Sequence, residues 1–179
     1  IDKYGVNDET SVTHREVFFD IEIEIGGALT DKYIKSAPMP VTSIAWWDKQ
    51  ADQWAIIILD KTGEIKAGMQ ERNWNPDQPI RIAGVASLDY MRLHKKYSFQ
   101  QEPSMKLDFL GEKYVGQKKI EYNGSLDRLF AEDKQKFIEY NFVDVLILKK
   151  LDEKFKYLDL TKNISHKGKT LYEDVYQSS

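Results

Sequence analysis

The sequence predicts a layered α/β or α+β domain, in which helices pack on a sheet. Strand-like segments dominate the first half of the chain, beginning with residues 16–25, where apolar and other side chains alternate with a period of two. A long amphipathic helix is expected in the second half, over residues 133–158. At 179 residues the chain fits one domain. We expect residues 1–15 to be a lead-in and residues 16–179 to form that domain.

Three more strands are expected after the first, at residues 41–47, 53–59 and 80–88. The third strand of the chain ends in four consecutive apolar residues, which favours a central strand covered on both faces. The polar residues 61–79 are expected to be a loop.

A short helix is expected after the fourth strand, ending at Lys96. Further helices are expected over residues 104–115, 125–130 and 133–158. The apolar stripe of the long helix has members three and four residues apart: Phe137, Tyr140, Asn141, Asp144, Ile147, Leu148, Leu151, Phe155 and Leu158. From Thr161 the chain is polar, with one more helix expected near residues 170–176.

Composition narrows the classes of function. The chain has no cysteine, which excludes disulfides, thiolate metal sites and a cysteine nucleophile. A net charge of −3 argues against a protein that coats duplex DNA. No apolar run approaches the roughly 20 residues of a membrane span, and no secretion leader is seen. We expect a cytoplasmic protein without a membrane partner.

Two acids of the first strand are candidate metal ligands. Asp20 and Glu22 are two residues apart, so their carboxylates project from one face of a rigid strand. Paired carboxylates suit Mg²⁺ or Mn²⁺. An equally simple alternative is that Asp20, Glu22 and Glu24 form the solvated side of an amphipathic strand.

The long helix supplies a third candidate. Asp144 lies one turn after Tyr140 within the apolar stripe, and a carboxylate there is costly unless it is paired or bound to a cation. No neighbouring residue of the helix pairs with it, so its partner has to come from elsewhere in the fold. If the helix crosses the first strand, one metal site satisfies Asp20, Glu22 and Asp144. The alternative is a buried Asp that accepts bonds from Asn, Tyr or backbone donors.

Other chemistry-bearing residues give weaker signals. His14, His94 and His166 lack ligand spacing and are expected at the surface. The basic stretch at residues 92–96 and the pair Lys118–Lys119 are expected to be solvated. No phosphate-binding loop or nucleophile elbow is present.

Several segments, in order, resemble the 3′–5′ proofreading exonuclease domain of family B DNA polymerases, in the branch of T-even-type phages and cyanophages. FFDIEIE resembles the first exonuclease motif and YNFVDVLIL the third. PMPVTSIAWWDKQADQWAIIIL, GVASLDYMRLHKKYS and KLDFLGEKYVGQKKIEYNGSLDRLF resemble the segments around them. The resemblance covers the chain from about Glu16 to the tail.

The resemblance implies a ribonuclease H-like α/β fold, with a mixed sheet flanked by helices, that removes nucleotides from single-stranded DNA 3′ ends. It implies two Mg²⁺ (or Mn²⁺) ions held by Asp20, Glu22 and Asp144, with Tyr140 helping to orient the attacking water. Other replication proteins are implied as possible partners. Polymerase activity is not expected, because the chain stops before any palm or fingers segment.

One departure from the family concerns its second motif, N-x-x-x-F-D, which is missing. Only about twenty residues separate Asp60 from Ile80, so the core is shortened and one catalytic carboxylate is lost. We expect weaker metal binding and low or no nuclease activity. Asp89, just past the fourth expected strand, is a candidate substitute. The alternative function is a non-catalytic remnant that binds single-stranded DNA or a replication partner.

Overall fold

The computed structural model describes residues 14–24, 40–59, 85–99 and 101–177. They form an antiparallel three-stranded sheet of β1 (Val17–Ile23), β2 (Val41–Asp48) and β3 (Gln53–Ile58), in the order β1-β2-β3. The mixed α/β class is therefore confirmed. Both described strand pairings are antiparallel, whereas a mixed sheet also contains a parallel pair. The ribonuclease H-like assignment therefore stays a prediction.

The register of the sheet decides which side chains face the helices. Phe18 lies opposite Trp47, Asp20 opposite Ala45 and Glu22 opposite Ser43. A tight turn joins β2 to β3, and Asp48 stabilises it by accepting the backbone N–H groups of Gln50 (3.1 Å) and Ala51 (3.0 Å). The expected strands at residues 16–25, 41–47 and 53–59 are confirmed within one or two residues.

The expectation that β3 is covered on both faces is wrong, and most of the fourth expected strand lies outside the described residues. In the described part of the chain β3 pairs only with β2 and is an edge strand, not a central one. Its apolar run does not need two covered faces, because Ile56 and Ile58 pack into the core while Ile57 is 59% exposed. Of the expected strand 80–88, residues 80–84 lie outside the described residues, and residues 85–88 are irregular.

Six described helices complete the domain: α2 (Tyr90–Tyr97), α3 (Leu107–Val115), α4 (Leu126–Glu132), α5 (Lys134–Phe155), α6 (Tyr157–Gly168) and α7 (Tyr172–Gln177). The long helix is shorter than expected, because Lys156 adopts a left-handed backbone conformation (φ 56°) that ends α5. The chain then starts α6, so the polar tail from Thr161, in which a helix is expected only near residues 170–176, is already helical through Gly168. The helix expected near residues 170–176 is confirmed as α7.

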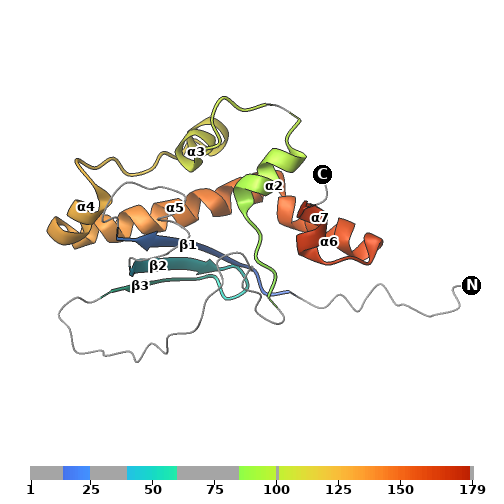
Figure 1. Cartoon of the computed structure of the whole chain (residues 1–179), viewed down its shortest axis with the longest axis horizontal. Coiled ribbons are helices and arrows are strands. Elements are labelled where there is room, and N and C mark those ends of the chain that lie inside the picture. The colour runs from blue at the N-terminus through green and yellow to red at the C-terminus, as the bar shows by residue number, and fades with distance from the viewer. Residues whose placement is uncertain (1–13, 25–39, 60–84, 100, 178–179) are drawn as a thin grey trace, which may run out of the picture.

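Helix α5 is the centre of the molecule, because it contacts the sheet on one side and other helices on the opposite side. Val145 packs with Phe18, Ala45 and Trp47 of the sheet. Ile147 and Leu151 pack with Leu110 of α3, which Figure 1 shows on the side of α5 away from the sheet.

The other face of the sheet carries apolar side chains that the described helices leave uncovered. Val17, Phe19 and Ile21 of β1 are 45%, 49% and 45% exposed.

Within the described ranges, no helix has the length and hydrophobicity to span a bilayer. Of the expected lead-in, residues 1–13 lie outside the described residues, and Arg15 pairs with Asp48.

Candidate metal centre

Three carboxylates converge between the sheet and α5. Asp20 and Glu22 come from β1 and Asp144 comes from the middle of α5. One oxygen of each lies within 4.8 Å of the others. The structure therefore brings together three of the acids that the sequence singled out, although Asp144 is separated from Glu22 by more than a hundred residues.

Local contacts place α5 so that Asp144 reaches β1. Asn141, one turn before Asp144, accepts a hydrogen bond from Ser43 Oγ (2.6 Å) and donates one to the backbone carbonyl of Phe137 (2.7 Å). Ser43 is the register partner of Glu22. Because Asn141 and Ser43 are both buried, this bond fixes the position of α5 along β2 beside the cluster.

The solvated-strand alternative for Asp20 and Glu22 is wrong. Both side chains are half-buried beneath α5, while the opposite face of the same strand exposes Phe19 and Ile21. The strand thus points its acids toward the protein interior and its apolar residues away from α5. Covering carboxylates costs free energy, so their placement indicates a use for the charge.

Burial and mutual repulsion raise the pKa values of the cluster. Desolvation, followed by the nearby charges of Asp20 and Asp144, raises the pKa of Glu22 to about 7. Desolvation raises the pKa of Asp144 to about 6, with Asp20 contributing repulsion and Lys119 opposing the shift. The pKa of Asp20 is also raised, mainly by desolvation. Without a cation, the cluster therefore retains protons near neutral pH.

Lys119 is a member of this site that sequence reasoning missed. Its Nζ lies 2.5 Å from Asp144 Oδ2 and donates a hydrogen bond to Tyr140 Oη (3.1 Å). The expectation that Lys119 is a solvated surface lysine is wrong, since its side chain is only 28% exposed. Burial lowers the pKa of Lys119, but Asp144 and Tyr140 together raise it above its ordinary value.

The turn after α3 delivers Lys119 to the cluster. Gly116 ends α3 in a left-handed conformation (φ 65°), and the Lys119 backbone N–H then donates to Asp108 Oδ1 (2.8 Å). At Gly111, a side chain would come within 2.6 Å of the Gln117 carbonyl and 2.9 Å of Ile147, so glycine allows this turn to lie against α5. No local periodicity in the sequence encodes these contacts.

Asp144 also keeps one oxygen without a partner. The residue is 1% exposed, and no hydrogen-bond donor in the described residues reaches Oδ1. A buried polar atom without a partner is uncommon in folded proteins and calls for an explanation. Three carboxylates with one free, buried acceptor are a donor set that fits a hard divalent cation such as Mg²⁺ or Mn²⁺.

Tyr140 lies beside the carboxylates, one helical turn before Asp144. It is 7% exposed, and its ring meets that of Tyr122 edge to face. Burial and the charge of Asp144 raise its pKa, so the hydroxyl stays protonated. Tyr140 and Lys119 also line an open hollow of about 460 Å³, together with Asp108, Lys118, Ile120, Glu121, Tyr122 and Asn123.

Asp89 is not among the three clustered acids. It is the N-cap of α2, and its Oδ1 accepts the backbone N–H groups of Met91 (2.9 Å) and Arg92 (3.4 Å). This contact stabilises the first turn of α2. The geometry gives Asp89 a capping role and does not bring it to the carboxylate cluster.

One expected surface histidine is in the core. His94 is 1% exposed and packs edge to face against Tyr114, Phe155 and Tyr157.

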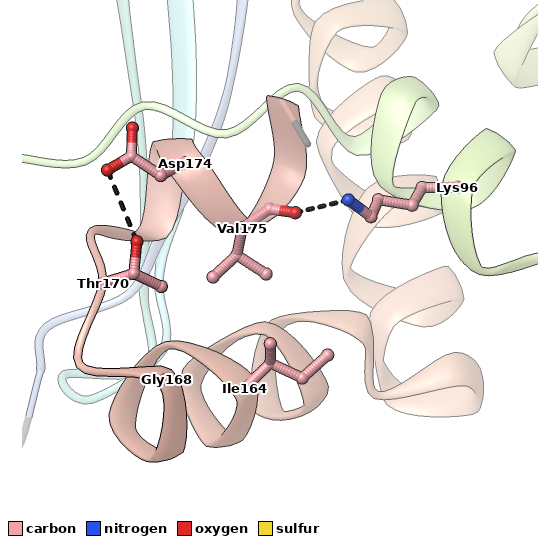
Figure 2. Close-up of a pocket in the computed structure, with 6 residues that line it drawn as sticks. All are labelled: Lys96, Ile164, Gly168, Thr170, Asp174 and Val175. Carbon is pink, nitrogen blue, oxygen red and sulfur yellow. Dashed lines mark hydrogen bonds between the residues drawn. The ribbon is translucent and has the colours of Figure 1, made fainter. Parts of the chain in front are cut away.

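A second hollow of about 440 Å³ lies between α2, α6 and α7, and Lys96, two residues after His94, lines it. There Lys96 Nζ donates to the Val175 carbonyl (2.5 Å), a contact that fastens α7 to α2 (Figure 2).

The fold and the site together define a mixed α/β domain with an acidic centre suited to a divalent cation. No family model matches the chain. It is 29% identical over 106 residues to the DNA-directed DNA polymerase of Escherichia phage RB69, across 59% of this chain and 12% of that polymerase. It is 27% identical over 113 residues to the DNA-directed DNA polymerase of Enterobacteria phage T4, across 63% of this chain and 13% of that polymerase.

These similarities support a region related to phage DNA polymerases, as the resemblance to the T-even-type branch implied. The chain spans about an eighth of the length of these curated relatives. The exonuclease assignment goes beyond the similarities and rests on the site.

Proposed function

We propose that this chain is a metal-dependent 3′–5′ exonuclease of ribonuclease H-like fold that acts on single-stranded DNA 3′ ends. One observation carries the proposal: Asp20, Glu22 and Asp144 converge under α5 with a buried, unpartnered oxygen on Asp144. Similarity to phage DNA polymerases supports DNA as the substrate. In this proposal the strand end approaches the cluster from the open hollow that Tyr140 and Lys119 line.

In this proposal the three carboxylates hold Mg²⁺ or Mn²⁺. When bound, such a cation lowers the pKa of a water molecule and neutralises charge on the leaving oxygen. Tyr140 keeps its hydroxyl proton and positions the attacking water by hydrogen bonding. Hydrolysis breaks the last phosphodiester, leaves a 3′ hydroxyl on the shortened strand and frees a nucleoside 5′-monophosphate.

The missing second motif predicts a slow enzyme. In the family that motif contributes a further carboxylate between the third strand and the segment of α2. The corresponding residues 60–84 of this chain lie outside the described residues. Among the described acids, three take part in the cluster, and Lys119 already neutralises one of them. Weak metal binding and a low cleavage rate are therefore the expected behaviour.

The direct test is degradation of a 5′-labelled single-stranded oligonucleotide with Mg²⁺ or Mn²⁺. We expect shortening from the 3′ end by the unaltered chain and none by Asp20→Asn. Glu139→Gln is the matched control, because Glu139 is an exposed acid of α5 that bonds Gln135. Equal cleavage by all three proteins would show a contaminating nuclease and refute the proposal.

A non-catalytic remnant that binds single-stranded DNA or a replication partner is the second candidate. The Lys119–Asp144 ion pair favours it, because an ammonium already satisfies one oxygen of the buried acid. Fluorescence anisotropy with a labelled oligonucleotide in EDTA distinguishes the non-catalytic remnant from the exonuclease. Tight binding without cleavage in either metal would establish the remnant, whereas cleavage establishes the enzyme.

A further inference from the structure

We propose that Lys119 takes the place of a second cation in the carboxylate cluster, so that this chain binds one divalent ion and not two. The inference rests on the proposed function, since it concerns the same metal centre. It specifies how many divalent ions the centre binds and which residue sets that number.

The two oxygens of Asp144 have different surroundings. Oδ2 lies 2.5 Å from Lys119 Nζ, so an ammonium occupies that side of the carboxylate. Oδ1 is buried and has no partner among the described residues. A cation that uses Oδ1 together with Asp20 and Glu22 leaves the ion pair intact. A second cation bound through Oδ2 has to displace Lys119.

The charges of the described cluster balance with a single divalent ion. Three ionised carboxylates contribute −3 and the Lys119 ammonium contributes +1, which leaves −2. One Mg²⁺ or Mn²⁺ neutralises that charge completely. A second divalent ion would leave a charge of +2 in this partly buried site while Lys119 is present, but only +1 once Lys119 is replaced by a neutral residue. Like charges repel more strongly in such a site than in water, so Lys119 disfavours the second ion.

Lys119 is held in the cluster by more than the ion pair. Its Nζ also bonds Tyr140 Oη (3.1 Å) and lies 5.1 Å from the centre of the Tyr140 ring, a cation–π distance. Its backbone N–H is bonded to Asp108. The adjacent Lys118, by contrast, is 59% exposed and pairs with Glu112 outside the cluster. The ammonium of Lys119 is therefore a fixed part of the site.

The test is a Mn²⁺ titration of the whole chain at about pH 8, above the pKa of about 7 of Glu22, with free Mn²⁺ followed by electron paramagnetic resonance. We expect one ion on the unaltered chain, one on Lys118→Met and two on Lys119→Met. Lys119→Arg keeps the charge and is expected to bind one. Circular dichroism checks that each variant is folded. If Lys119→Met does not fold, the number of Mn²⁺ ions bound by the unaltered chain decides the question.

Two ions on the unaltered chain would overturn the role of Lys119 but leave the proposed nuclease standing. One ion on both the unaltered chain and Lys119→Met would also overturn that role. Absence of Mn²⁺ from every variant would overturn both proposals, because the metal centre itself would then fail.

Discussion

Helix α5 buries two carboxylates, Asp144 and Asp152, in different environments. Asp144 is 1% exposed and Asp152 is 3% exposed, and desolvation raises the pKa of both. Asp152 Oδ1 accepts bonds from Tyr90 Oη (3.3 Å) and the Leu158 backbone N–H (3.2 Å). Asp144 faces two other carboxylates and one ammonium, and its Oδ1 has no partner in the described part of the chain.

The difference separates a structural acid from a candidate functional one. Asp152 receives neutral donors where α5 ends and α6 begins, so its carboxylate stabilises the break in the helix. Asp144 is placed among like charges, which costs free energy in the absence of a cation. Burial alone therefore does not identify a metal ligand. The unpartnered oxygen and the nearby carboxylates distinguish Asp144 from Asp152.

The largest expected effect comes from exchanging each acid for its amide. Asp144→Asn should reduce Mn²⁺ affinity and DNA cleavage by at least about 100-fold, because even residues that merely support metal ligands account for 10–100-fold. Asp152→Asn should leave both unchanged. Cleavage rates and Mn²⁺ titrations measure the effect. If the two variants behaved alike, the distinction between the two buried acids of α5 would be lost.

The pH dependence of Mn²⁺ affinity should follow the raised pKa values. Glu22 with a pKa of about 7 and Asp144 with a pKa of about 6 hold protons at pH 5 that a cation has to displace. We expect apparent affinity to rise by about tenfold or more between about pH 5 and about pH 7. Isothermal titration at several pH values tests this, and an affinity that is flat across the range would contradict it.

Without metal, the same groups should make folding stability fall as pH rises. Their folded-state pKa values exceed the ordinary 4.5 of Glu and 3.8 of Asp, so the folded chain binds more protons than the unfolded chain. Their contribution is complete below about pH 4 and is lost by about pH 7. Urea unfolding in EDTA should show this slope in the unaltered chain, and Glu22→Gln should flatten it.

A smaller effect is expected from truncating the structural acid. Asp152→Ala removes the acceptor of Tyr90 and Leu158, and we expect the free energy of unfolding to fall by about 2 kcal/mol. Urea denaturation measures it. The Mn²⁺ stoichiometry should not change, and a loss of metal binding in a folded Asp152→Ala protein would show that the two acids act together.

The smallest effect is expected at Asp89. Asparagine caps helices about as well as aspartate, so Asp89→Asn should change stability by less than about 0.5 kcal/mol. Mn²⁺ binding and cleavage should be unaffected. A marked loss of either would restore Asp89 as a substitute for the missing carboxylate.

Much of the site could be predicted from β1 and α5. The two-residue spacing of Asp20 and Glu22 places them on one face of any strand, and the stripe around Asp144 follows from helical geometry. The break at Lys156 could not be predicted in the same way, because the apolar spacing continues through Leu158. There Asp152 bonds the Leu158 N–H beyond the break, a contact that helical periodicity does not contain.

The sequence by itself determined the directions of side chains within each element, since local backbone geometry fixes them. It thereby determined that Asp20 and Glu22 point the same way and that Asp144 lies one turn from Tyr140. Only the tertiary structure decided that the acidic face of β1 is the one covered by α5, and that Lys119 enters the cluster. Contacts between distant segments depend on how elements pack, and a period of two or of 3.6 residues carries no information about them.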